Sequence, residues 1–236
     1  TNDDGNCGYP SSSTDTVTEC NSYTWNDSTY IQNGTFSYTS SPASNSYSMA
    51  FNTTSDHIKV NNISNINTGS GKYISVEFWM YWDGTNQVMP ISFNYYSIYL
   101  SNGLIGFDGG TGSSATCSAS GLANSWHHIV AVFYDYGFNG SVFQQSMNYE
   151  KLYIDGQARS LNRSVGGCGG QDFNNFRISG WDVQTAHTFK GDISRVSLWN
   201  GELTQTQINN LYICPPLGNE SDLVGYWDFE DNSDPA

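Results

Sequence analysis

Two stretches of this chain, residues 73–82 and 126–134, alternate apolar and polar side chains with a period near two. Such alternation is typical of extended strands, whose successive side chains point to opposite faces. Each strand therefore offers one face to a core and the other face to solvent or a ligand. Shorter stretches with the same pattern recur along the chain, and they predict an all-β protein built from two packed antiparallel sheets.

Three dipeptides predict tight turns between these strands: Asp83-Gly84, Asn102-Gly103 and Asp155-Gly156. The primed turns of β-hairpins need positive φ at both central residues, which Gly adopts freely and Asn or Asp tolerates. We therefore expect a hairpin at each of the three places.

One short helix is expected after Leu203. Thr204 followed by Gln207 is a capping-box pattern, and Ile208 and Leu211 would share one face. Pro215 would then prevent the helix from continuing.

The charge balance restricts the partners. The chain has 22 acidic and 8 basic residues, a formal net charge of −14. That argues against binding to nucleic acid, which needs a basic surface, and no apolar run is long enough to insert into a membrane. Acidity favours either solubility or a bound cation such as Ca²⁺, for which Asp3, Asp4 and Asp228 are candidate ligands.

The five cysteines include no C-x-x-C pair, so disulfides in an oxidising compartment are the expected use. Cys7 with Cys20 would close a short loop, and Cys117 and Cys168 lie in Gly/Ser-rich segments that a disulfide could join. Cys214 is left over, either as a thiol or paired with a segment outside this chain. These features predict a secreted or cell-surface protein.

The domain boundaries are expected at residues 1–45, a Cys-containing N-terminal lead-in, and 46–236, the β domain. Residues 214–236 would either supply a closing strand or begin a following repeat. The chain begins Thr1-Asn2 without a signal peptide, so we expect a mature protein or an excised module, with further modules of the same polypeptide as partners.

The order of several segments resembles the laminin-G-like jelly rolls of the concanavalin A-like lectin/glucanase group. The segments are Ser48-Met49-Ala50-Phe51, Asp56-His57-Ile58-Lys59-Val60, Val76-Glu77-Phe78-Trp79, Ser125-Trp126-His127-His128-Ile129, Lys151-Leu152-Tyr153-Ile154-Asp155-Gly156 and Phe189-Lys190-Gly191-Asp192-Ile193-Ser194-Arg195-Val196. The resemblance implies a jelly-roll sandwich that binds glycans or proteins, often with Ca²⁺ at its rim. The N-terminal and C-terminal segments resemble connecting segments in large secreted proteins of marine Bacteroidetes.

Saccharide binding needs flat rings for the apolar face of a sugar and planar polar groups for its hydroxyls. Aromatic residues make up 15% of this chain, and some lie near predicted turns together with polar residues. The candidate ligand contacts of this kind are Asn94, Tyr95, Tyr96, Asp108, Trp181 and His187. An acidic polysaccharide would also need cations, and Arg163 and Arg177 lie near predicted loops.

His127 and His128 raise the possibility of catalysis. They are adjacent on a strand and therefore point to opposite faces, so they cannot act together on one atom. One of them could be the base of a lyase that acts on a uronate-containing algal polysaccharide, with a Tyr as acid. No carboxylate pair of the kind that glycosidases use is found in the sequence.

Three functions remain open at this point. A module that binds a polysaccharide, either algal or on a cell surface, is favoured. The alternatives are the polysaccharide lyase and a protein-binding repeat of an adhesin.

Overall fold

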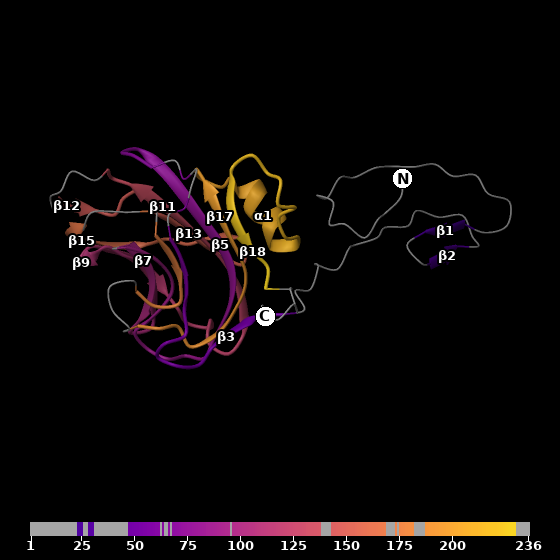
Figure 1. Ribbon diagram of the computed structural model, residues 1–236, viewed down its shortest axis with the longest axis horizontal. Coiled ribbons are helices and arrows are strands. Elements are labelled where there is room, and N and C mark those ends of the chain that lie inside the picture. Colours follow the sequence, from indigo (N-terminus) through magenta and orange to yellow (C-terminus); the bar gives the residue numbers. More distant parts are fainter. Residues whose placement is uncertain are drawn as a thin grey trace.

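The computed structural model describes residues 23–25, 28–30, 47–61, 63, 66, 68–94, 96–137, 143–168, 173, 175–181 and 187–229. Within these residues the fold is two antiparallel sheets packed face to face, with one α-helix, α1 (Gln205–Ile213), outside them (Figure 1). The predicted all-β sandwich is confirmed.

The first sheet, sheet I, has nine described strands in the order β12-β15-β10-β8-β7-β6-β16-β4, with β9 paired to β15. Its strands are β4 (Ile58–Val60), β6 (Val88–Phe93), β7 (Tyr96–Ser101), β8 (Leu104–Asp108), β9 (Gly110–Thr111), β10 (Ser114–Ser118), β12 (Phe143–Ser146), β15 (Asn162–Cys168) and β16 (Phe176–Ile178).

The second sheet, sheet II, has seven described strands in the order β14-β13-β11-β5-β17-β18, with β3 paired to β17. Its strands are β3 (Met49–Phe51), β5 (Lys72–Trp82), β11 (Trp126–Asp135), β13 (Lys151–Ile154), β14 (Gln157–Ala158), β17 (Gly191–Asn200) and β18 (Leu223–Trp227). The C-terminal strand β18 thus extends this sheet. In the described residues nearer the N-terminus, β1 (Tyr23–Trp25) pairs antiparallel with β2 (Ser28–Tyr30).

The alternation in β5 builds the main core between the sheets. Phe78, Met80 and Trp82 are buried against inward-facing rings of sheet I such as Phe93 and Phe107. Trp79 and Tyr81 lie on the other face of β5 and are partly exposed, as the period-two pattern predicts.

Two of the three predicted hairpins are confirmed. Asn102 and Gly103 join β7 to β8, and Asp155 and Gly156 join β13 to β14, with positive φ at all four residues. The prediction for Asp83-Gly84 was wrong, because β5 and the next strand β6 belong to different sheets. This loop crosses between the sheets, and the dipeptide alone does not distinguish a crossing loop from a hairpin.

The helix has the predicted capping box between Thr204 and Gln207, and Ile208 and Leu211 are buried. It covers the outer face of sheet II, where it lies beside β17 and β18 in Figure 1. Val130 and Trp199 of the sheet pack beneath it.

A buried carboxylate lies under this helix. Glu77 Oε1 accepts hydrogen bonds from Arg195 Nη2 at 3.2 Å and from His128 Nε2 at 3.0 Å, and Oε2 accepts from Ser197 Oγ at 2.6 Å. Arg195 occupies a β-bulge of β17 with φ of 46°, and its guanidinium also donates to the carbonyl of Leu211 in α1.

Burial acts to raise the pKa of Glu77. The Arg195 guanidinium and the hydrogen bonds from His128 and Ser197 outweigh this effect, so the pKa lies below its ordinary value. The carboxylate is therefore ionised and fixes Arg195, which ties β5, β17 and α1 together.

The predicted link between Cys117 and Cys168 is not formed. Cys117 is a free thiol that points into the sandwich. Ser114 of β10 pairs with Ser164 of β15. Cys117 lies three residues to one side of this pair, and Cys168 lies four residues to the other side, because the strands are antiparallel. The two residues are roughly 20 Å apart along the strands at about 3.3 Å per residue, far beyond the reach of a disulfide. Cys214 is buried, and Cys7 and Cys20 lie outside the described residues.

Replacing Glu77 by Gln would leave Arg195 buried without its counter-charge. We expect the free energy of unfolding in urea to fall by about 3–5 kcal/mol at pH 7. Because the folded pKa is lowered, the contribution of Glu77 should be present above the ordinary carboxyl pKa of 4.5 and be lost as the pH falls through the folded value. The control is Glu202→Gln, which removes a partly exposed ion pair with Lys151 and should cost less than about 1 kcal/mol. Equal stability of the two variants would contradict the role of Glu77.

The thiol of Cys117 gives a second prediction. Burial raises its pKa, so iodoacetamide should leave it unmodified in the native protein and alkylate it after unfolding in guanidinium without reductant. Peptide mass spectrometry would measure the modification. A peptide that joins Cys117 to Cys168 would contradict the structure.

Candidate functional site

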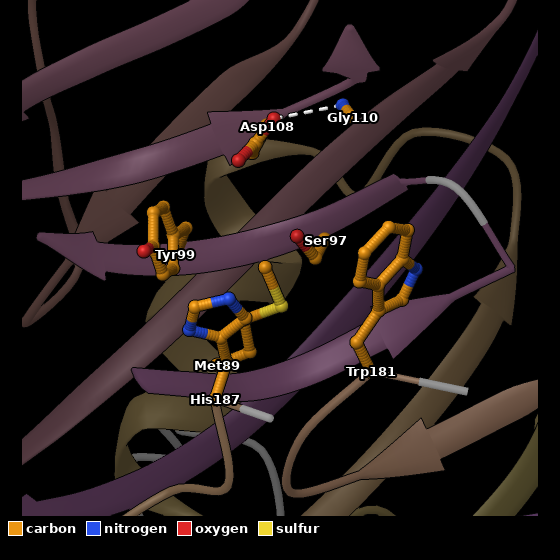
Figure 2. Close-up of a pocket in the computed structure, with 7 residues that line it drawn as sticks. All are labelled: Met89, Ser97, Tyr99, Asp108, Gly110, Trp181 and His187. Carbon is orange, nitrogen blue, oxygen red and sulfur yellow. Dashed lines mark hydrogen bonds between the residues drawn. The ribbon is translucent and has the colours of Figure 1, made fainter. Parts of the chain in front are cut away.

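The outer face of sheet I contains a hollow of about 110 Å³. Its lining comes from neighbouring strands and one loop, and Figure 2 shows Trp181 and Tyr99 on opposite sides of Ser97. The lining residues are Met89, Ser97, Tyr99, Asp108, Gly110, Trp181 and His187.

Strand alternation directs the polar lining residues outward. In β7, Ile98 and Leu100 belong to the core, so Ser97 and Tyr99 point to the other face. Ser97 lies directly opposite Asp108 of β8, which brings the hydroxyl and the carboxylate to the same side of the sheet.

The loop that follows β16 positions Trp181. Ser179 and Gly180 both have positive φ, at 72° and 78°, and Gly180 N donates to Met89 O at 2.8 Å. The indole Nε1 of Trp181 then donates to the backbone carbonyl of Asn94 at 2.6 Å. These bonds hold the indole ring at the edge of the hollow.

His187 is held from the same side. Its carbonyl accepts from Met89 N at 2.8 Å, and its Nδ1 donates to the carbonyl of Gln87 at 2.9 Å. The neutral ring therefore keeps its proton on Nδ1 and leaves Nε2 as an acceptor. The imidazole also packs edge-on against Tyr99, with ring centroids 5.4 Å apart.

Asp108 supplies the carboxylate of the hollow. Its Oδ1 accepts from Gly110 N at 2.7 Å, which fixes the side chain at the end of β8. The hollow thus combines two aromatic rings, a hydroxyl, a carboxylate and an imidazole, a set that can contact the apolar face of a sugar and hydrogen-bond its hydroxyls.

The structure brings together three of the residues predicted as ligand contacts: Asp108, Trp181 and His187. Asn94 contributes its backbone carbonyl to the indole of Trp181 rather than a side chain to the lining. Tyr95 lies outside the described residues.

The positions of Tyr96, Arg163 and Arg177 correct the prediction that these residues contact a ligand. Tyr96 is 1% exposed, because it shares the inward face of β7 with Ile98. Arg177 is buried, and its Nε donates to Ser179 O, so it supports the loop that carries Trp181.

Arg163 lies opposite Ala115, a core residue, so its side chain leaves from the inner face of β15, but it stays 28% exposed. Its guanidinium contacts the buried carboxylate of Glu150 at 3.3 Å and the carbonyl of Met147. The sequence correctly predicted that Arg163 lies near a loop. It did not show that the guanidinium forms an ion pair with Glu150.

The two histidines face opposite sides of β11, as predicted, and neither is placed as a substrate base. His128 is fully buried beside Glu77 and Trp79, and no hydrogen-bond partner is found for its Nδ1 in the described part of the chain. No substrate can reach it there.

His127 donates from Nδ1 to Asp155 Oδ2 at 2.8 Å, while its Nε2 lies 2.9 Å from Ser125 Oγ and 3.2 Å from the carbonyl of Gly121. The Ser–His–Asp order is that of a hydrolase triad. Because Nδ1 donates to Asp155, the neutral ring accepts from Ser125 Oγ at Nε2. None of these three residues lines the hollow. The ring therefore holds the β13–β14 turn against β11.

Within the described residues, no three His, Cys, Asp or Glu side chains come together as a metal site would require. Asp3 and Asp4 lie outside those residues, and Asp228 follows β18. Calcium binding therefore stays a prediction. No helix in the described chain is long and apolar enough to cross a bilayer.

Sequence reasoning missed Met89, Ser97, Tyr99 and Gly110. The alternation in residues 96–100 did contain the information for Ser97 and Tyr99, since an inward set of Tyr96, Ile98 and Leu100 leaves the residues between them on the outer face. Met89 lies within a register shift of β6 against β7, between Val88 and Ile91, which simple alternation does not reveal.

Comparison with known families matches residues 52–209 to the concanavalin A-like lectin/glucanases superfamily, in its laminin G form. The chain belongs to this superfamily. Comparison with curated proteins found no match.

Among solved structures, the chain is similar to a candidate carbohydrate-binding protein from Bacteroides ovatus, at 18% identity and a TM-score of 0.50 over 74% of this chain and 52% of that one. It is also similar to domains LG4-5 of the mouse laminin α1 chain, at 14% identity and a TM-score of 0.45 over 69% and 44%. Domain 4 of an extracellular GH43 arabinanase from Geobacillus stearothermophilus, in complex with arabinotriose, matches at 16% identity and a TM-score of 0.45 over 70% and 76%. The chain thus spans about half the length of the first two proteins.

Proposed function

We propose that this domain is a carbohydrate-binding module that holds a saccharide in the hollow on the outer face of sheet I. The observation that carries the proposal is the indole of Trp181, held by its bond to Asn94 at one side of the hollow, with Tyr99 at the other side. Flat rings in this position suit the apolar face of a sugar. Three further lining residues, Ser97, Asp108 and His187, offer hydrogen-bonding groups to the hydroxyls of the sugar.

The role described for the Bacteroides ovatus protein agrees with this proposal. We propose that the module lies outside the cell, as one part of a larger polypeptide, and that it binds an algal or cell-surface glycan. One bound Ca²⁺ and an origin in marine Bacteroidetes stay predictions. The abundance of acidic and aromatic residues supports an extracellular glycan-binding role.

The alternatives have less support. A lyase needs an accessible base beside the substrate, and His128 is buried while His127 is hydrogen-bonded at both nitrogens. A protein-binding repeat has no contact in the described residues that favours it over the saccharide.

The test is Trp181→Ala, measured by affinity electrophoresis in gels that contain single polysaccharides and by titration with their oligosaccharides. We expect the dissociation constant to rise at least about tenfold, because loss of a central aromatic contact costs more than about 1.4 kcal/mol. The matched control is Trp126→Ala, which removes a tryptophan that is 41% exposed on sheet II.

Equal effects of the two substitutions would contradict the proposed location. Binding to no saccharide, together with retained binding to a protein partner, would favour the adhesin repeat. Growth of ultraviolet absorbance from unsaturated uronates during incubation would favour the lyase.

A further inference from the structure

A line of small polar residues continues from the hollow across sheet I. Ser97 of β7 lies opposite Asp108 of β8, Asp108 lies opposite Ser114 of β10, and Ser114 lies opposite Ser164 of β15. Directly opposed residues share one face of a sheet, so all four side chains point to the outer side. Ser97 is only 3% exposed and lies at the floor of the hollow, whereas Asp108, Ser114 and Ser164 are more exposed. At about 4.8 Å between strands, the line is roughly 14 Å long.

The side chains along this line are short. Ser114 Oγ and Ser164 Oγ are 2.9 Å apart, and Ser164 Oγ donates to the carbonyl of Gly112 at 3.1 Å. Backbone groups of Gly110 and Gly112 contact Asp108 and Ser164 of this line. We name this line of Ser97, Asp108, Ser114 and Ser164 the serine track, and it leads from the hollow across β8, β10 and β15.

The cations of the protein are held elsewhere. All eight Lys and Arg residues lie in the described chain, and none of them lines the hollow. Three are ion-paired with Glu: Lys151 with Glu202, Arg163 with Glu150 and Arg195 with Glu77. Lys190 donates to the carbonyl of Asn52, Lys72 lies on β5 of sheet II, and Arg159 follows β14 of the same sheet.

Lys59 and Arg177 are the cations on the outer face of sheet I, and they lie beyond Ser92 at its β16–β4 end. Counting strands in register places Arg177 roughly 14 Å and Lys59 roughly 19 Å from Asp108. Arg177 is buried with its Nε donating to Ser179 O, Lys59 lies one strand further away, and neither residue lines the hollow. The carboxylate of Asp108 therefore sets the charge that a ligand meets on the serine track.

We propose that the serine track binds an uncharged saccharide chain that runs across the strands, and that Asp108 is the specificity-determining residue that excludes carboxylated and sulfated saccharides. This inference rests on the proposed function, since it assigns the ligand class of the same hollow. The hydroxyls of the track and the acceptor oxygens of Asp108 are suited to sugar hydroxyls, whereas a uronate would bring a second negative charge beside a carboxylate without a cation to offset it.

The experiment compares Asp108→Asn with the wild-type protein. Asn keeps the shape and can still accept the hydrogen bond from Gly110 N. The probes are neutral hexasaccharides of glucose, xylose, arabinose, mannose and galactose, and hexasaccharides of galacturonate and mannuronate, each titrated by calorimetry. Asp83→Asn is the matched control, because Asp83 Oδ1 also accepts an amide two residues ahead, at 2.7 Å, and does not line the hollow.

We expect the wild-type protein to bind at least one neutral probe and to bind the uronates at least about tenfold more weakly. Asp108→Asn should raise the affinity for uronate relative to neutral probe by about tenfold, and Asp83→Asn should leave that ratio unchanged. Equal binding of uronate and neutral probes by the wild type, or an unchanged ratio in Asp108→Asn, would overturn the charge selection while the proposed saccharide binding stands. Binding of none of the probes would remove both.

The direction of the chain is tested by Ser164→Gln, which adds bulk at the end of the track. Its control is Val165→Gln on the opposite face of the same strand, where Val165 is 65% exposed. We expect Ser164→Gln to weaken binding of the hexasaccharide but not of the corresponding disaccharide, and Val165→Gln to change neither. Equal binding of the hexasaccharide by both variants would show that the chain does not cross β15.

Discussion

The buried carboxylate of Glu77 is the constraint on which the arrangement of this domain depends. A carboxylate without exposure to water is stable only with a counter-charge and satisfied lone pairs. Arg195 provides the charge, and it reaches Glu77 because a β-bulge in β17 turns it outward. The same guanidinium binds the carbonyl of Leu211, so the position of α1 follows from the charge beneath it.

This arrangement makes the two outer faces of the sandwich different. The helix covers the centre of sheet II, where Tyr212 stacks on Trp79 at a ring separation of 5.5 Å. Sheet I carries the hollow and the serine track on its outer face instead. Its aromatic rings come from a strand and from a loop, and the loop is held by backbone hydrogen bonds to β6. A sheet face that carries aromatic rings beside polar side chains is suited to ligands that have both apolar and hydrogen-bonding surfaces.

The sequence was informative wherever local geometry decides the outcome. The period-two pattern placed Phe78, Met80 and Trp82 inside, and the capping box placed the helix, because both effects depend on residues only a few positions apart. It was misleading for Asp83-Gly84, since the same dipeptide serves a hairpin or a crossing loop according to which sheet the next strand joins. It was also misleading for Tyr96, which lies near a predicted turn, and for Cys117, which lies in a Gly/Ser-rich segment, because both side chains are in the core.

The sequence by itself determined that this is an acidic, ring-rich β-sandwich, because strand alternation and composition are properties of neighbouring residues and of the whole chain. It also singled out Asp108, Trp181 and His187. Only the tertiary structure decided that these three residues meet in one hollow and that Arg163 is paired with Glu150. The register of five neighbouring strands decides both points, and register depends on contacts between segments far apart in the chain.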